Sequence, residues 1–292
     1  MRDCNVALVQ VCSGPDIHQS LAAAAAWTRR ALDGGAELVA LPENFWGIGP
    51  EGGKTAFACD LADPESSPIL ARMAAISAET DALIALGGLP ERAADGDPAL
   101  GRGLVYNTFA LLRRGTVVAS YRKIHRFDVT LADGSTLTES ATVAAGSRPT
   151  AVRTSLGTLG LSICYDLRFP TLYQSLVAAG AEIILIPAAF TLLTGIDHWS
   201  VLLRARAIET QSYVLAPAQF GRHNQTRHSF GHSMIIDPWG TVIAQASPTA
   251  GVVTARLDAA FLTKVRGDLP SLRHRALPDP PTAHVIDLSD PA

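Results

Sequence analysis

The sequence predicts an α/β fold of four layers, αββα, built from two similar halves that pack sheet against sheet. Six short apolar runs are continuous rather than alternating, which is typical of strands that helices cover on at least one face. Helical patterns separate these runs, and each half closes with a hairpin. The order strand, helix, strand, helix, strand, hairpin therefore occurs twice. Each half would form a sheet with one apolar face that needs a partner.

The elements follow in order along the chain. Helices are expected at residues 20–33, 66–79, 171–179 and 198–211. Gly34 and Gly180 follow the first and third of these helices as stop signals. The hairpins are expected to turn at Arg114-Gly115 and around Pro238-Trp239-Gly240. The strand-like runs are NVALVQV (5–11), AELVALP (36–42), ALIALGG (82–88), TLGLSIC (158–164), AEIILIP (181–187) and SYVLAPA (212–218).

Two segments lie outside this repeat. The stretch 127–149 lacks periodicity and joins the halves, and a structureless connection of that length inside a compact domain tends to be functional. Residues 271–292 are rich in proline and arginine. We therefore expect a single domain over residues 1–270, followed by a C-terminal tail that packs on the surface or on a partner subunit.

Composition excludes several classes of function. With 292 residues, 48% of them hydrophobic and 17% charged, the chain can bury a large core. A formal net charge of -3 gives no reason to expect a nucleic acid or an anionic membrane as partner. No signal peptide or membrane-spanning run is evident. The four scattered cysteines are expected to be reduced thiols in a cytoplasmic protein: Cys4, Cys12, Cys59 and Cys164.

Three reactive side chains follow three separate predicted strands. They are Glu43 after 36–42, Lys123 after the first hairpin, and Cys164 at the end of 158–164. In open α/β sheets the loops at the carboxyl ends of strands converge on the ligand. A carboxylate, an ammonium and a thiol at that edge suit acyl transfer through a thiolate. Taken singly, each has a structural explanation, and a lone cysteine is most often a small buried hydrophobe.

Residues close to Cys164 extend this hypothesis. The helix expected after Cys164 favours a thiolate at its N-terminus, and the backbone N–H of Tyr165 could bind an oxyanion. Arg168 could bind a substrate carboxylate through paired hydrogen bonds, or could form a structural salt bridge instead. Phe190 and Thr194 follow the strand 181–187 and could line the same pocket.

The three motifs together resemble the nitrilase superfamily of carbon–nitrogen hydrolases over nearly the whole chain. LVALPENF is similar to the glutamate motif of that family, YRKIHRFDV to its lysine motif and LSICYDLRFP to its cysteine motif. The resemblance implies the αββα sandwich, with Glu43 as general base, Lys123 as the cation of the tetrahedral intermediate and Cys164 as the nucleophile that forms a thioester. Glu139 matches a second glutamate that some members place near the lysine and the substrate.

Later segments of the chain resemble one branch of this superfamily. Residues 195–223 and 230–244 are similar to the branch that contains deaminated-glutathione amidase and ω-amidase, and residues 204–211 and 219–224 favour the first. The stretch 43–57 differs from the sequence expected after the glutamate in either of these two enzymes. The resemblance implies a small amide substrate, no cofactor or metal, and a homodimer or larger homo-oligomer. If Arg168 binds a substrate carboxylate, the substrate is an acidic ω-amide.

Other functions compete with an amidase. His223, His228 and His232 would suggest a metal hydrolase, but they lie in a glycine-punctuated segment without an acid at ligand spacing. A serine hydrolase lacks its GxSxG motif here. A catalytically silent binding protein would have no chemical need for all three of Glu43, Lys123 and Cys164. The choice between an amide and a nitrile stays open.

Overall fold

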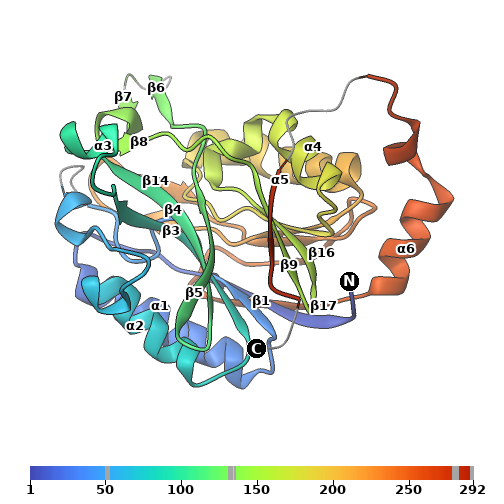
Figure 1. Cartoon of the computed structure of the whole chain (residues 1–292), viewed down its shortest axis with the longest axis horizontal. Coiled ribbons are helices and arrows are strands. Elements are labelled where there is room, and N and C mark those ends of the chain that lie inside the picture. The colour runs from blue at the N-terminus through green and yellow to red at the C-terminus, as the bar shows by residue number, and fades with distance from the viewer. Residues whose placement is uncertain (50–52, 131–133, 135, 278–282, 290–292) are drawn as a thin grey trace.

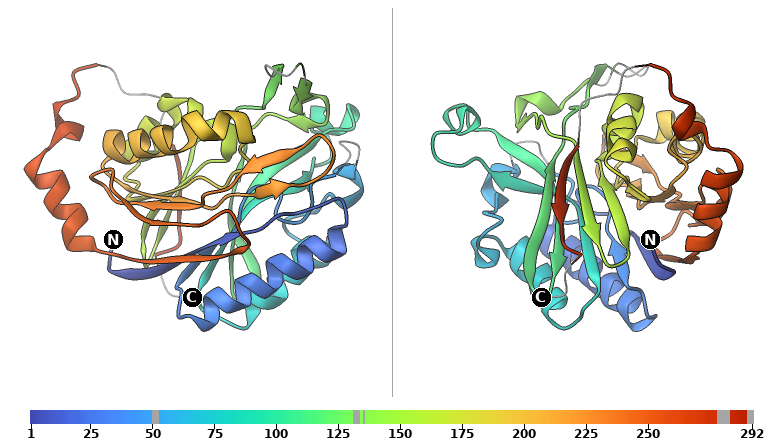
Figure 2. Two further views of the ribbon diagram at one scale, coloured as in Figure 1. Left: turned by 180° about the vertical axis from the view of Figure 1, so that it is seen from behind. Right: turned by 45° about the vertical axis from the view of Figure 1, so that its right-hand side comes forward.

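The chain folds into two stacked β-sheets with helices on both outer faces (Figure 1). The computed structural model describes residues 1–49, 53–130, 134, 136–277 and 283–289. Helices α1 (Ile17–Asp33) and α2 (Pro68–Ala78) cover the first sheet, and α4 (Pro170–Ala178) and α5 (Leu192–Thr210) cover the second. The four layers are seen along the sheets in Figure 2. The αββα prediction is confirmed.

Each sheet has seven strands within the described residues. In both, three parallel strands continue into an antiparallel hairpin, and one antiparallel strand lies on the other side. The first sheet runs β17 (Gly251–Leu257), β1 (Cys4–Gln10), β2 (Leu38–Ala40), β3 (Leu83–Arg92), β4 (Val105–Arg113), β5 (Thr116–Arg122), with β8 (Val143–Ala144) beside β4. The second runs β16 (Val242–Gln245), β15 (Met234–Ile236), β12 (Tyr213–Ala216), β11 (Ile183–Leu185), β10 (Gly157–Leu161), β9 (Thr150–Thr154), β18 (His284–Asp287).

Buried side chains on both faces explain why the strands read as continuous apolar runs. In β1, Val6 and Leu8 belong to the core between the sheets, whereas Ala7 and Val9 belong to the core beneath α1 and α2. Successive side chains of a strand point to opposite faces, so a strand inside this sandwich must be apolar at every position.

The structure adds elements that the sequence did not predict. The strand β17 comes from late in the chain and pairs with β1 of the first sheet. Helix α6 (Ala259–Asp268) follows it. Part of the C-terminal segment forms β18, which pairs in parallel with β9. The connection 127–149 is not structureless, because it contains the hairpin of β6 (Asp128–Thr130) and β7 (Thr136–Thr138), and also β8.

Helix α5 begins six residues before the predicted start at 198. Gly195 obscures its first turns in the sequence, because glycine is a poor helix former. A Cβ at Gly195 would lie 2.3 Å from the Cβ of Phe230. The glycine therefore permits close packing of α5 on the small hairpin of β13 (Phe220–Arg222) and β14 (His228–Phe230). No helix in the described part of the chain is long and apolar enough to cross a membrane.

Candidate active site

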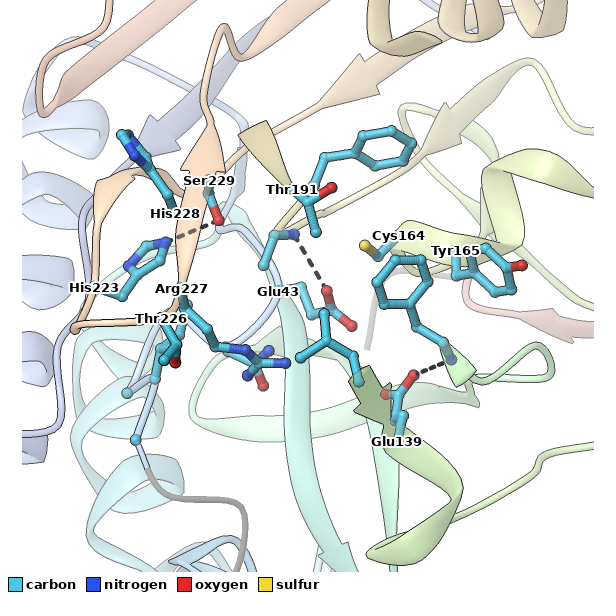
Figure 3. A pocket seen from close by; sticks show the side chains of 18 of the residues that line it. Glu43, Glu139, Cys164, Tyr165, Thr191, His223, Thr226, Arg227, His228 and Ser229 are labelled. Carbon is cyan, nitrogen blue, oxygen red and sulfur yellow. Dashed lines mark hydrogen bonds between the residues drawn. The ribbon is translucent and has the colours of Figure 1, made fainter. Parts of the chain in front are cut away.

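A cavity opens where the carboxyl ends of the parallel strands of both sheets meet. Its volume of about 730 Å³ lies within the usual range for small-molecule sites. Glu43, Lys123, Cys164 and Glu139 all line it, so the structure brings together side chains that are up to 121 residues apart in the chain. Figure 3 shows the Cys164 sulfur pointing into this cavity, on the side of Glu43.

A sharp turn after β10 presents Cys164. The residue has a φ angle of 49°, in the left-handed region that is uncommon for residues other than glycine, and it begins the 3₁₀ helix Cys164–Arg168. Its N–H donates to the carbonyl of Pro187 at 2.8 Å, which fixes the turn against the neighbouring strand end. The Tyr165 N–H belongs to the first turn of this helix, where backbone N–H groups have no intrahelical acceptor. The α-helix predicted at 171–179 is α4, which begins at Pro170, and the 3₁₀ helix lies between it and the end of β10.

Glu43 is held in place by donors from both sheets. Its Oε1 accepts hydrogen bonds from Lys123 Nζ at 2.8 Å and from Asn107 Nδ2 at 2.9 Å, and its Oε2 accepts from the N–H of Ala189 at 3.2 Å. Glu43 is buried, with 4% of its surface exposed. Gly88, in a β-bulge of β3, leaves room for the Glu43 side chain. A Cβ at Gly88 would lie 2.6 Å from Asn107 Oδ1 and 3.4 Å from Glu43 Cγ.

Lys123 lies between two carboxylates. Besides Glu43, its Nζ donates to both oxygens of Glu139, at 3.1 and 2.9 Å. Burial opposes the charge of Lys123, but the Glu139 and Glu43 carboxylates outweigh it and raise its pKa well above the ordinary value. Burial likewise opposes the charge of Glu139, yet Lys123 and Lys54 lower the pKa of Glu139 to about 2. The lysine and the second glutamate are therefore both charged at neutral pH.

The pKa of the Cys164 thiol is set by burial and by two neighbouring charges. Burial raises its pKa well above the ordinary value, the Glu43 carboxylate raises it further, and Lys123 opposes them only in part. The resting sulfur therefore carries its proton at neutral pH. Because Glu43 is near enough to affect the thiol in this way, the arrangement can transfer that proton to a carboxylate when the sulfur attacks.

Two positioning residues escaped the sequence analysis. The side chain of Asn107 donates to Glu43 Oε1 at 2.9 Å and to Glu139 Oε1 at 3.1 Å, so one amide keeps both carboxylates oriented toward Lys123. Asp166 is fully buried and accepts hydrogen bonds from the Tyr121 hydroxyl and the Ile163 N–H, at 2.7 and 2.9 Å. It thereby joins the end of β5, which precedes Lys123, to the turn of Cys164. A polar residue within an apolar run was the available signal for both.

The remaining predicted residues also line the cavity. Arg168 lies over the rings of Phe190 and Tyr165, with its guanidinium carbon 5.1 and 5.9 Å from the ring centres. Its Nη1 lies 3.2 Å from His198 Nδ1. Within the described residues no carboxylate pairs with Arg168, so the structural salt bridge that the sequence left open is absent there. The Thr194 hydroxyl hydrogen-bonds that of Thr191 at 2.7 Å.

The three histidines do not form a cluster. His223 is buried, with Nδ1 2.7 Å from the carbonyl of Ser13 and Nε2 2.8 Å from Ser229 Oγ, and burial lowers its pKa to about 4. His228 lies at the rim of the cavity, and His232 stacks on Phe230. In the ranges that the structure describes, no three His, Cys, Asp or Glu side chains are placed to hold a metal ion.

Comparison with known proteins agrees with this geometry. The sequence profile of the carbon-nitrogen hydrolase family matches residues 5–267. The chain belongs to this family. This carbon–nitrogen hydrolase is 45% identical over 273 residues to a deaminated glutathione amidase from Synechocystis sp. (strain PCC 6803 / GT-S), a comparison that covers 92% of this chain and 97% of that protein. The human deaminated glutathione amidase is 43% identical, with 92% and 81% covered.

Solved structures give the same assignment. The NitFhit protein of Caenorhabditis elegans superposes with a TM-score of 0.85 at 36% identity, covering 94% of this chain and 66% of NitFhit, a nitrilase and fragile histidine triad fusion protein. Saccharomyces cerevisiae Nit3, a member of branch 10 of the nitrilase superfamily, gives 0.81 at 29% identity, with 94% and 97% covered. The resemblance to the nitrilase superfamily is confirmed. The protein is a hydrolase of carbon–nitrogen bonds other than peptide bonds, and its substrate is a small-molecule amide.

Proposed function

We propose that this carbon–nitrogen hydrolase is an amidase that cleaves deaminated glutathione through a thioester on Cys164. One observation carries the mechanism: Glu43, Lys123 and Cys164, from three separate strand ends, meet at the buried end of one cavity. The substrate follows from the relatives of 43–45% identity that bear the name deaminated glutathione amidase.

Acylation begins with proton transfer. Glu43 takes the proton of the Cys164 thiol while the sulfur attacks the amide carbon, so a C–S bond forms as the C=O π pair moves to oxygen. The ammonium of Lys123 and the N–H of Tyr165 stabilise this oxyanion. The oxyanion then collapses, the C–N bond breaks, and Glu43 returns its proton to the leaving nitrogen. An amine departs and a thioester remains.

Deacylation reuses the same groups. Glu43 removes a proton from a water molecule, whose oxygen attacks the thioester carbon. When the second tetrahedral intermediate collapses, the C–S bond breaks and the sulfur recovers the proton from Glu43. The acid leaves and the enzyme is back in its resting state, with no net change of charge on the protein.

Glu139 stabilises the lysine during both steps. Glu43 is neutral whenever it holds the travelling proton, and without Glu139 the buried Lys123 ammonium would then have only the transient oxyanion as its counter-charge. An unpaired buried cation costs several kcal/mol of free energy. The Glu139 carboxylate, with its pKa lowered to about 2, remains ionised and paired with Lys123 throughout.

A cation near the nucleophile suits an acidic acyl group. Arg168 contacts only rings and a histidine among the described residues, and its planar guanidinium can bind a carboxylate through two hydrogen bonds. Phe190 lies against Arg168, and Thr194 lines the same cavity. The α-keto acid end of deaminated glutathione would therefore bind at Arg168, with the scissile amide over Cys164.

A release assay on a substrate panel tests the function. The panel contains deaminated glutathione, 2-oxoglutaramate, simple aliphatic amides and the matching nitriles, with kcat/KM measured for each. We expect deaminated glutathione to give the highest value. A strong preference for 2-oxoglutaramate would instead make the protein an ω-amidase, and no product from any compound would favour a catalytically silent binding protein.

Replacing Arg168 by alanine is expected to raise KM for acidic amides by about 10- to 100-fold and to leave KM for neutral aliphatic amides nearly unchanged, because a lost charge-assisted pair weakens only anion binding. Steady-state kinetics on one acidic and one neutral amide measure this difference. An equal loss on both substrates would assign Arg168 to structure.

We also propose a homodimer or larger homo-oligomer in the cytoplasm. Val201 and Ile208 of α5 are 66% and 49% exposed and lie on one side of the helix, Ile196 nearer its start is 61% exposed, and Trp239 is 58% exposed. The four free cysteines of the described residues suit a reducing compartment. Residues 1–270 would act as one domain, with the segment 271–292 as a tail anchored through β18.

A further inference from the structure

The cavity carries a second guanidinium that the mechanism does not use. Arg227 lies just before β14, at the end of the β13–β14 hairpin, and it lines the cavity. Figure 3 shows its side chain reaching inward from the side of Glu43 that is opposite Cys164 and Tyr165. Arg168, in contrast, lies on the side of Tyr165. The two guanidinium groups therefore flank the nucleophile from opposite walls.

The backbone of Arg227 is fixed. Its N–H donates to Asn224 Oδ1 at 2.8 Å, and its carbonyl accepts from the N–H of His223 at 2.9 Å. His223 is itself held at both ring nitrogens, by Ser13 and Ser229. A loop closed in this way gives the Arg227 side chain a defined starting point, which reduces the entropy lost when the guanidinium binds a ligand.

Among the residues placed in the structure, none pairs with the guanidinium of Arg227. Within the residues that the structure describes, it forms no hydrogen bond, ion pair or ring contact, although the residue is half-buried. Among the described residues, the cavity lining contains four Lys or Arg side chains and only two acidic ones, Glu43 and Glu139, and both of these are bound to Lys123. The excess of positive charge is therefore left for a ligand.

Lys54 is one of these four basic side chains. Burial lowers the pKa of Lys54, the Glu139 and Glu43 carboxylates oppose that effect, and the charges of Lys123 and Arg227 add to it. Two cations that repel one another across a pocket bind an anion between them favourably, because the anion relieves the repulsion and pairs with both. The chain as a whole has a net charge of -3, so this local excess is not a general property of the surface.

We propose that Arg227 binds a carboxylate on the leaving-group side of the amide, so that the enzyme takes amides with an acidic group on each side of the scissile bond. This inference rests on the proposed function, in which Arg168 holds the acyl group. If the acyl chain runs from Cys164 toward Arg168, the amine must extend toward the opposite wall. An amino acid or short peptide leaving group would bring its terminal carboxylate to Arg227, whereas ammonia would leave Arg227 empty.

Three substrates with the same acyl group test the inference. They are deaminated glutathione, its C-terminal carboxamide and 2-oxoglutaramate, whose leaving groups are an anionic dipeptide, a neutral dipeptide amide and ammonia. We expect Arg227→Ala to lower kcat/KM for deaminated glutathione by about 10- to 100-fold and to change the other two by less than about threefold. Arg227→Lys, which retains the charge, should recover part of the loss.

The controls separate this inference from the proposed function. Arg222 lies on the same hairpin, outside the cavity lining, and its guanidinium donates to the carbonyls of Asn224 and Gln225. Arg222→Ala removes the same charge and should affect the three substrates equally. If the wild-type enzyme hydrolyses the acid and the carboxamide equally well, or if Arg227→Ala lowers all three rates alike, the inference is wrong while the amidase stands. If the wild-type enzyme cleaves none of the three, the proposed function itself fails.

Discussion

The Cys164→Ala variant is expected to lose amide hydrolysis, with kcat lower by about 10⁴- to 10⁶-fold, because no other group at the buried end of the cavity can form the acyl bond. Product release under saturating substrate measures this loss. The thiol is small and its removal leaves no large void, so thermal unfolding should stay close to that of the wild type. Mass spectrometry of the wild-type enzyme quenched during turnover should find the acyl group on the peptide that contains Cys164.

A matched cysteine variant provides the control. Cys12 is an exposed free thiol that does not line the cavity. Cys12→Ala should keep full activity and the same trapped adduct. An acyl group on another peptide, or substantial hydrolysis by Cys164→Ala, would remove the thioester mechanism.

The Glu43→Gln variant is expected to lose about 10²- to 10⁴-fold in kcat although its nucleophile becomes more acidic. Burial and the Glu43 carboxylate both raise the pKa of Cys164 in the wild type. Removing the negative charge removes the second effect and leaves Lys123 nearby, so the pKa of Cys164 must fall. Hydrolysis must nevertheless slow, because a glutamine cannot carry the proton to the leaving nitrogen. The pH dependence of Cys164 alkylation, followed by mass spectrometry alongside turnover, measures both changes.

This prediction is discriminating because turnover falls together with the pKa of Cys164, although a lower pKa alone would favour attack by the thiolate. If Glu43 served only to hold Lys123, the pKa of Cys164 would fall and turnover would persist. Glu79 is an exposed carboxylate that pairs with Arg29, so Glu79→Gln should leave both quantities unchanged. A pKa of Cys164 that rises in Glu43→Gln would contradict the electrostatic account of the site.

The sequence was informative wherever local chemistry decides structure. Continuous apolar runs identified the parallel strands. Glu43 and Cys164 follow two of these runs and Lys123 follows the hairpin strand β5, and the three residues lie together because these strand ends meet at one edge. Their positions could be predicted without knowing any contact. Their catalytic roles stay predictions until the variants are measured.

The features that the sequence analysis did not identify depend on contacts between residues far apart in the chain. Asn107 and Asp166 matter through hydrogen bonds to residues far along the chain, which a polar residue in an apolar run signals but does not specify. Arg227 lies in a loop whose orientation follows from the buried ring of His223. Gly195 hides the start of α5 because its value is close packing on Phe230 and not helix propensity.

The strand β17 has a consequence for the order in which the enzyme can become active. It is made after almost the whole second sheet, yet it pairs along the full length of β1, which precedes every other strand in the described part of the chain. Until residue 257 has been synthesised, β1 has an unpaired edge, and the sheet that supplies Glu43 and Lys123 is incomplete. Synthesis of the chain thus delays the assembly of a reactive sulfur until the surrounding protein is nearly finished.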